Sequence, residues 1–215
     1  MKRLFLIGIL LGFAGSLAAA HWVPWVRYDR LPSQTSVVAN GGRQETFVIR
    51  LPADRIVAFG GNGQLRGSSY PSGFDALAAA GETAPLVEHF KVRDSAGSVI
   101  GVAARHRVVL SDGVESTWLL SIPSRGSLVL AGPGEPNGRV DSELKAHGYV
   151  PGTAWSGDVA LAVAPDAAVT RTISSTGEFR DLAVQFTEIW ALTGVTEHGE
   201  LRGTIVLDTI GRRTL

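Results

Sequence analysis

The stretch AVQFTEIWALTG, residues 183–194, holds an acidic side chain in a setting that suits acid–base chemistry. Side chains alternate between the two faces of a strand, so Val184, Phe186, Glu188 and Trp190 would share one face. If that face lines the interior of a sheet, Glu188 is a carboxylate among aromatic rings. Removal from water penalises a charged carboxylate, which is how many enzymes prepare a general acid or base. The alternative is that Glu188 lies near a barrel mouth, paired with an arginine.

A second group that could do chemistry is the densest basic cluster, Arg105, His106 and Arg107. On a strand the two arginines would point to one face and the histidine to the other. We expect the cluster on the solvated exterior of a barrel, and the alternative is a contact with an anionic ligand. The five histidines form none of the spacings HxH, HxxH or HExxH. We therefore expect no metal site and no other cofactor.

The stretch ISSTGEF, residues 173–179, is either a polar loop that grips a ligand or a tight link between two strands. Thr176 and Gly177 suit a turn, and Phe179 would return the chain to the core. We favour the structural link. Trp118, in ESTWLLSIP, is interpreted as a core residue rather than a platform for a cofactor. The catalytic residues are unknown, and the candidate ligand-binding residues are Trp118, Phe179, Phe186, Glu188 and Trp190.

Amino-acid composition excludes several classes of protein. The chain has 215 residues, of which 45% are hydrophobic and 19% are charged, as in ordinary globular proteins. It contains no cysteine, which excludes disulfides, thiolate catalysis and iron–sulfur clusters. Its 20 basic residues balance its 20 acidic residues, so it lacks the basic excess of proteins that bind nucleic acid.

The N-terminus predicts export. Lys2 and Arg3 precede an uncharged, mostly apolar run, residues 4–20, that ends in three alanines, as in a secretory signal peptide. The alternative is an uncleaved membrane anchor over residues 4–26. At about 1.5 Å of rise per residue, these two lengths would span about 26 Å and 34 Å, against a bilayer core of about 30 Å. We expect a periplasmic protein, either soluble or anchored to the inner membrane by residues 4–26.

Alternating runs bounded by glycine turns dominate the rest of the chain. ETFVIRL (45–51) and RIVAF (55–59) predict two strands. Three further pairs of β-like runs turn at Gly97, Gly126 and Gly199. These pairs predict three hairpins of an antiparallel meander.

The domain organisation follows from this pattern. Short helices are expected at 74–80 and 138–148, the second of them closed by Gly148. Residues 27–44 are polar and rich in turn formers, which is typical of a linker. We predict an all-β fold, a single antiparallel β-barrel or sandwich over residues 45–215 with one or two short helices, preceded by the N-terminal hydrophobic helix.

Residues of about 90–184 resemble the allene oxide cyclase and dirigent superfamily, whose members contain the segment G-G-T-G-x-F-x-x-A-x-G. The matching positions are Thr176, Gly177 and Phe179 in that segment, Asp94, Gly97, Ile100 and Gly101 in an upstream hairpin, and Gly126 and Gly132 in a later strand pair. Ser174 and Ser175 stand where the family has two glycines, and Val184 where it has a third. The resemblance implies an eight-stranded antiparallel barrel. In the family, cyclase activity depends on a buried carboxylate and a bound water.

Three functions are compatible with the sequence. The first is an exported, non-enzymatic β-barrel that binds an apolar small molecule or a partner protein of the envelope. The second is an isomerase or cyclase like allene oxide cyclase, with Glu188 or Asp94 as the carboxylate. The third is a structural or assembly factor tethered to the membrane by its N-terminal segment and recognised through loops such as 60–73.

Overall fold

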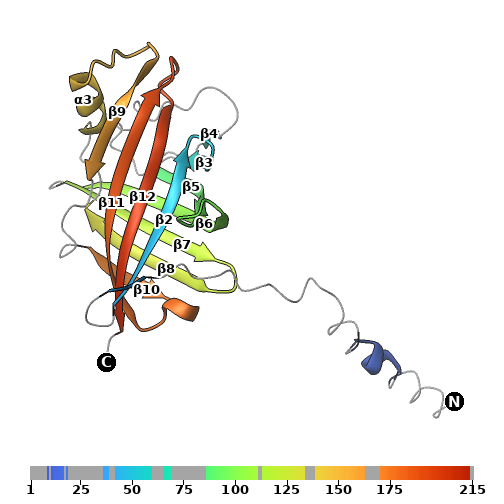
Figure 1. Ribbon diagram of the computed structural model, residues 1–215. Coiled ribbons are helices and arrows are strands. Elements are labelled where there is room, and N and C mark those ends of the chain that lie inside the picture. The colour runs from blue at the N-terminus through green and yellow to red at the C-terminus, as the bar shows by residue number, and fades with distance from the viewer. Residues whose placement is uncertain are drawn as a thin grey trace.

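The computed structural model of the chain describes residues 9, 11–16, 18, 36–38, 42–59, 65–68, 86–110, 113–133, 139–162 and 170–213. Most of these residues lie in antiparallel strands of one sheet, which curls into a partly closed barrel (Figure 1). The prediction of an all-β, antiparallel barrel-like fold is therefore confirmed.

Half of the neighbouring strands around the curl are also neighbours in sequence. They are β1 (Ser36–Val38), β2 (Gly42–Leu51), β3 (Arg55–Phe59), β4 (Leu65–Ser68), β5 (Leu86–Arg93), β6 (Val99–Leu110), β7 (Gly113–Ile122), β8 (Gly126–Pro133), β9 (Trp155–Ala162), β10 (Arg171–Ser175), β11 (Leu182–Val195) and β12 (Leu201–Arg213). Their order in the sheet is β10-β8-β7-β6-β5-β2-β12-β11-β9. Outside this path, β1 pairs with β2, and β3 pairs with β4 and β5.

The three predicted hairpins are present. β5–β6, β7–β8 and β11–β12 are antiparallel pairs that turn at Gly97, Gly126 and Gly199. Each of these glycines has a positive φ, +90°, +127° and +80° respectively, a region that side chains with a Cβ rarely adopt. The glycines thus fix where each strand reverses, and with it the register of the strands that follow.

Threonine side chains close the curl between its two ends. β9 pairs with β11 only from Ile189 onward, so among the described residues the first half of β11 has no strand ladder on that side. Thr172 of β10 fills the gap, because its hydroxyl accepts a hydrogen bond from Val184 N at 2.7 Å and donates one to Val184 O at 3.1 Å. Phe186 N donates in the same way to the Thr170 hydroxyl at 3.0 Å. Side chains therefore replace the backbone ladder at this seam.

One helix was also expected correctly. The prediction of a short helix over 138–148 corresponds to α3 (Arg139–Ala146). The helix ends as its sequence suggests, with Gly148 at φ +87°. Gly148 N donates to Lys145 O, and Tyr149 N donates to Leu144 O, which is the Schellman pattern of helix ends. Leu144 and Tyr149 both join the core, so α3 covers one end of the sheet beside β9 (Figure 1).

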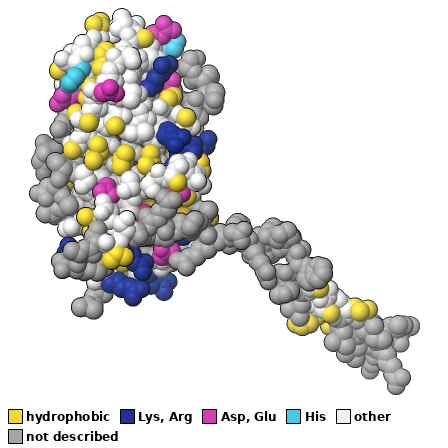
Figure 2. All heavy atoms as spheres, in the orientation of Figure 1, with side chains coloured by type: hydrophobic (Ala, Val, Ile, Leu, Met, Phe, Trp, Pro, Cys, Tyr) yellow, Lys and Arg dark blue, Asp and Glu magenta, His cyan; other side chains and the backbone are white. Residues whose placement is uncertain are grey.

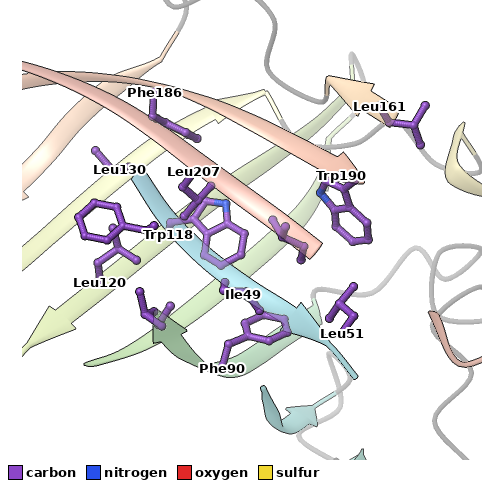
Figure 3. Packing of buried hydrophobic residues seen from close by; sticks show 14 of the residues in the cluster. Ile49, Leu51, Phe90, Trp118, Leu120, Leu130, Leu161, Phe186, Trp190 and Leu207 are labelled. Carbon is purple, nitrogen blue, oxygen red and sulfur yellow. The ribbon is translucent and has the colours of Figure 1, made fainter. Parts of the chain in front are cut away.

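The core fills the inside of the curl. Figure 3 shows Trp118 and Phe90 lying near Ile49 and Leu207, with Trp190 further along the same interior. Trp118, Phe90 and Ile49 are all fully buried. The rings of Phe90 and Trp118 lie 5.9 Å apart, within the range of favourable aromatic pairs. Large side chains from most of the strands therefore interlock across the interior.

Other expectations meet the structure only in part. Strands begin before residue 45, because β1 and the first residues of β2 lie inside the segment 27–44 that was expected to be a linker. The expected helix at 74–80 lies outside the described residues, as does most of the N-terminal segment 1–26. Residues 11–16 of that segment are helical. Among the residues described, no helix has both the length and the apolar character needed to cross a membrane.

Candidate functional site

Glu188 occupies the interior of the sheet. It is 0% exposed, and Phe186 and Trp190 on the same strand face are buried with it, as the alternation along β11 predicts. Trp118 Nε1 donates a hydrogen bond to Glu188 Oε2 at 2.8 Å, and Trp190 Nε1 donates to Oε1 at 2.7 Å. Arg105 Nη2 lies 3.4 Å from Oε1. Glu188 is thus an interior carboxylate among aromatic rings, as the first interpretation held. It is also paired with an arginine, as the alternative held, but it lies in the interior and not near a barrel mouth.

The pairing continues as a chain of buried charges. Arg105 Nη1 lies 3.5 Å from Glu88 Oε2, and Arg55 Nη2 lies 3.2 Å from Glu88 Oε1. The side chains of Arg55, Glu88 and Arg105 are all at most 5% exposed. Arg105 Nε also donates to the hydroxyl of buried Ser116 at 3.2 Å. Charges taken from water in this way need close partners, and here arginine and glutamate alternate.

Aromatic rings complete the surroundings of these guanidinium groups. The Arg105 guanidinium carbon lies 4.9 Å from the centroid of the Trp190 ring and 5.6 Å from that of Trp118. The Arg55 guanidinium lies 5.8 Å from the centroid of Phe90. Cation–π contacts at these distances are favourable and gain strength where water is absent. We call this set, Arg55, Glu88, Arg105, Trp118, Glu188 and Trp190, the interior cluster.

The expectation that Arg105 and Arg107 face a solvated exterior is wrong. They are 2% and 4% exposed and point inward, whereas His106 points outward and is exposed. For Arg105 the physical reason is that Glu88, its cross-strand neighbour on β5, and Glu188, on the distant strand β11, supply the opposite charges that make burial tolerable. The alternation of β5 offered a signal, since Glu88 shares its face with the apolar residues Phe90 and Val92.

The interior cluster has limited capacity for acid–base chemistry. A general base must approach the proton that it abstracts to hydrogen-bond distance. Both oxygens of Glu188 already accept hydrogen bonds from indole N–H groups, and the neighbouring rings of Trp118 and Phe186 are at most 1% exposed. The cluster therefore acts as a packed polar core that ties β6, β7 and β11 together.

Phe179, the fifth candidate, lies apart from the cluster at the end of the sheet where β11 begins. It is the last residue of a 3₁₀ turn, η3 (Gly177–Phe179), and is 4% exposed. The Arg125 guanidinium lies 5.1 Å from the centroid of its ring. Arg125 also donates to both oxygens of Glu45, at 2.5 and 2.7 Å, and more weakly to Glu178 at 3.4 Å. We call Glu45, Arg125, Glu178 and Phe179 the plug, because they pack together beside a cavity of only about 20 Å³.

The charge of Arg125 is well compensated. Burial alone would lower the pKa of its guanidinium, but the hydrogen bonds that it donates to Glu45 and the nearby charges of Glu45 and Glu178 outweigh burial and raise it. The guanidinium therefore stays protonated, and the plug holds the turn 173–179 against the β7–β8 hairpin.

The turn itself is held by hydrogen bonds of the backbone and of the Thr176 hydroxyl. Thr176 N donates to Ser127 O, and Ser127 N donates to the Thr176 hydroxyl, each at 2.9 Å. A Cβ on Gly177 would lie 2.3 Å from Arg125 O, and Gly177 has φ +59°. Both observations favour glycine at this position for structural reasons, in line with the structural reading of ISSTGEF.

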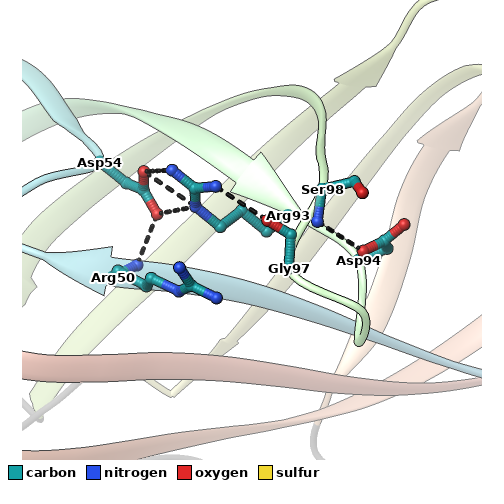
Figure 4. Close-up of polar contacts among 6 residues, drawn as sticks. All are labelled: Arg50, Asp54, Arg93, Asp94, Gly97 and Ser98. Atoms are coloured by element: carbon teal, nitrogen blue, oxygen red, sulfur yellow. Dashed lines mark hydrogen bonds and ion pairs between the residues drawn. The ribbon is translucent and has the colours of Figure 1, made fainter.

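Asp94, the other carboxylate considered for catalysis, is not part of the interior cluster. Its Oδ1 accepts a hydrogen bond from Ser98 N at 2.9 Å in the β5–β6 turn (Figure 4). Beside it lies a pair that the sequence did not indicate. Arg93 binds the fully buried Asp54 through Nε and Nη2 at 2.8 Å, and Asp54 also accepts from Arg50 N (Figure 4). Hydrogen bonding to Asp54 raises the pKa of Arg93.

An open groove of about 420 Å³ lies between β10 and the start of β11. It is lined by residues 170–175 and 181–185. Ile173 is 54% exposed there, Leu182 is half-buried, and Ser174 and Gln185 add polar groups. In the part of the chain that the structure describes, no three His, Asp or Glu side chains gather so that they could hold a metal ion.

Comparison with known proteins does not assign the chain to a family. No protein-family model matches the chain, and a search of curated proteins gives no match.

Proposed function

We propose that the protein is an exported β-barrel that works by binding rather than by catalysis, and that its ligand is an amphipathic small molecule held in the groove between β10 and β11. The observation that carries this proposal is the contrast between the two places. The side chains of the interior cluster are packed together, and the Glu188 carboxylate accepts hydrogen bonds from two indole N–H groups. The groove, by contrast, is open and has about 420 Å³ of space.

The groove has the size and chemistry for such a ligand. Small-molecule sites typically enclose about 300–1,000 Å³ and combine apolar walls with a few polar groups. Here Ile173 and Leu182 provide apolar contact, while Ser174 and Gln185 can hydrogen-bond a polar head. The groove also lies where hydroxyl groups replace a backbone ladder, so the two strands can separate slightly without breaking a run of backbone hydrogen bonds.

Binding can be tested by titrating residues 27–215 with a fluorescent fatty-acid probe. This fragment omits the apolar N-terminal run, which would take up the probe by itself. We expect saturable binding of one probe per chain, weakened at least about tenfold by Ile173→Asp, because a charge in the groove must be desolvated against an apolar chain. Val150→Asp is the matched control, since Val150 is similarly exposed but lies after α3.

Two results would count against this function. Equal effects of Ile173→Asp and Val150→Asp would place binding elsewhere, and no saturable binding would rule out the small molecule. If the probe fails but an envelope protein is retained on wild-type chain and lost with Ile173→Asp, the groove serves a partner protein instead.

Export and anchoring are proposed on the N-terminal sequence alone. Mass spectrometry of the mature N-terminus distinguishes the two forms. A chain that begins at His21 would be a soluble periplasmic protein, and an intact Met1 or Lys2 would indicate an anchor.

An isomerase like allene oxide cyclase remains the second candidate, favoured by the fully buried carboxylate of Glu188. It requires that a substrate reach Glu188. Soaking with cyclisable fatty-acid epoxides and following their loss by mass spectrometry tests it, with Glu188→Gln as the inactive variant. Turnover that survives this substitution would remove Glu188 from the reaction.

A further inference from the structure

We propose that one end of the sheet binds the surface of a membrane containing anionic phospholipid. Four exposed arginines define this basic end: Arg43, Arg180, Arg212 and Arg213. Figure 2 shows Lys and Arg side chains gathered at the end of the molecule where the chain terminates. The inference concerns a surface remote from the interior cluster and does not depend on the function proposed for the groove.

Strand pairing brings the four arginines together. Arg43 near the start of β2 is next to Gly211 of β12, one residue before Arg212. Arg213 pairs with Leu182 of β11, two residues after Arg180. Neighbouring strands lie about 4.8 Å apart, so the four side chains share one rim.

The nearby acidic side chains have other partners. Glu45 and Glu178 bind Arg125, and Asp208 accepts hydrogen bonds from Gln44 and Thr46. Asp181 is the exposed acidic residue of this rim. Among the residues that the structure describes, none of the four arginines forms an ion pair. Their positive charge therefore faces outward.

The opposite end of the sheet carries a different charge. Asp158 and Glu197 are exposed there, on β9 and in the β11–β12 turn, and Glu200 is half-exposed. Figure 2 shows acidic and histidine side chains at that end, among hydrophobic ones and a basic one. Because the whole chain has no net charge, this separation of charge along the sheet gives the molecule a preferred orientation towards an anionic surface.

The path of the chain agrees with that orientation. β1 pairs with Gly42, Arg43 and Gln44, so the chain enters the sheet at the basic end. Residues 27–35 precede β1 and can extend about 30 Å at most. An anchor at residues 4–26 would therefore hold the basic end, rather than the acidic end, close to the bilayer.

The test compares full-length chains in flotation with phosphatidylcholine vesicles made with or without phosphatidylglycerol. The ratio of binding to the two kinds of vesicle removes the apolar contribution of the N-terminal segment. Comparing this ratio between variants also removes the contribution of its charges, Lys2 and Arg3, which are the same in all variants. Each arginine near an anionic surface is worth roughly a fivefold gain in partitioning, so Arg212→Gln/Arg213→Gln should lower the ratio about 25-fold. Raising the salt concentration should lower the wild-type ratio as well.

Arg50→Gln/Arg202→Gln is the matched control. It removes the same charge from exposed positions of β2 and β12 nearer the opposite end, and should change the ratio less than about twofold. Equal losses in both double variants, or no preference of the wild type for anionic vesicles, would overturn the proposal. Arg43→Gln/Arg180→Gln tests the same surface independently, and circular dichroism checks that each variant is folded.

Discussion

Removing a charged side chain from water is costly, and the interior of this sheet holds Arg55, Glu88, Arg105 and Glu188. Each charge lies within 3.5 Å of an opposite charge or a strong hydrogen-bond donor. The two indole N–H groups on Glu188 are important here, because they satisfy both oxygens without adding a further charge. Such a network adds little net stability over an apolar core, but breaking it leaves a buried charge without compensation.

Glu188→Gln should therefore be strongly destabilising. The amide keeps the shape and one acceptor oxygen but presents an N–H₂ group to an indole donor, and Arg105 loses one of its two carboxylates. We expect a loss of about 3 kcal/mol in the free energy of unfolding, measured by urea denaturation followed by tryptophan fluorescence. Glu197→Gln, at an exposed position, should cost less than about 0.5 kcal/mol. Similar small losses in both variants would show that the cluster is energetically unimportant.

The two carboxylates on Arg125 should contribute unequally. Glu45 binds it through two short hydrogen bonds, whereas Glu178 lies at 3.4 Å. We expect Glu45→Gln to cost about 2 kcal/mol and Glu178→Gln less than about 1 kcal/mol, since paired hydrogen bonds between charged groups are the strong ones. Urea denaturation of the two variants side by side measures this, and the reverse order would contradict the geometry.

At the scale of elements, the seam between β10 and β11 is the part of the sheet whose stability depends on side chains. Thr170 and Thr172 satisfy backbone groups of Val184 and Phe186 that a neighbouring strand would otherwise bind. Local opening at this seam should therefore be easier than in the long β11–β12 ladder, which runs from Leu182 to Arg213.

Thr172→Val tests this dependence. Valine keeps the shape of threonine but leaves Val184 N and O without partners, which should cost about 1–3 kcal/mol. Thr172→Ser keeps the hydroxyl and should cost less than about 1 kcal/mol. Hydrogen exchange of the Val184 amide should accelerate in Thr172→Val and change little in Thr172→Ser. Unchanged exchange in both would mean that the hydroxyl does not hold the seam.

Local patterns predicted several of these elements for identifiable reasons. The turns at Gly97, Gly126 and Gly199 were predictable because glycine is suited to positive φ where a strand reverses. The inward face of β11 followed from alternation, and both Phe186 and Trp190 are buried on it.

Contacts between side chains on different strands were harder to predict from the sequence. Arg105 and Arg107 were expected outside, since an arginine is seldom buried unless a partner compensates it. Of the two glutamates that compensate Arg105, Glu188 lies far away in sequence, and Glu88 lies opposite it on the neighbouring strand β5. The Asp54–Arg93 pair was missed for the same reason. The seam was missed because a threonine hydroxyl that replaces a strand ladder leaves no periodic signal.

At the scale of the whole molecule, the sheet has three distinct regions. The interior is filled and holds buried charges, the groove between β10 and β11 is open, and the basic end lies where the chain enters the sheet. In the functions proposed above, the barrel interior stays packed while the groove binds a ligand and the basic end contacts a membrane.

Hydrogen exchange of residues 27–215 with and without a saturating fluorescent fatty-acid probe tests the central claim most directly, because it maps the bound probe along the chain. We predict slower exchange confined to 170–175 and 181–185, with the strands around Trp118 and Trp190 unaffected. Slower exchange centred on β7 and the second half of β11 would instead put the ligand in the interior beside Glu188, and would contradict binding in the groove.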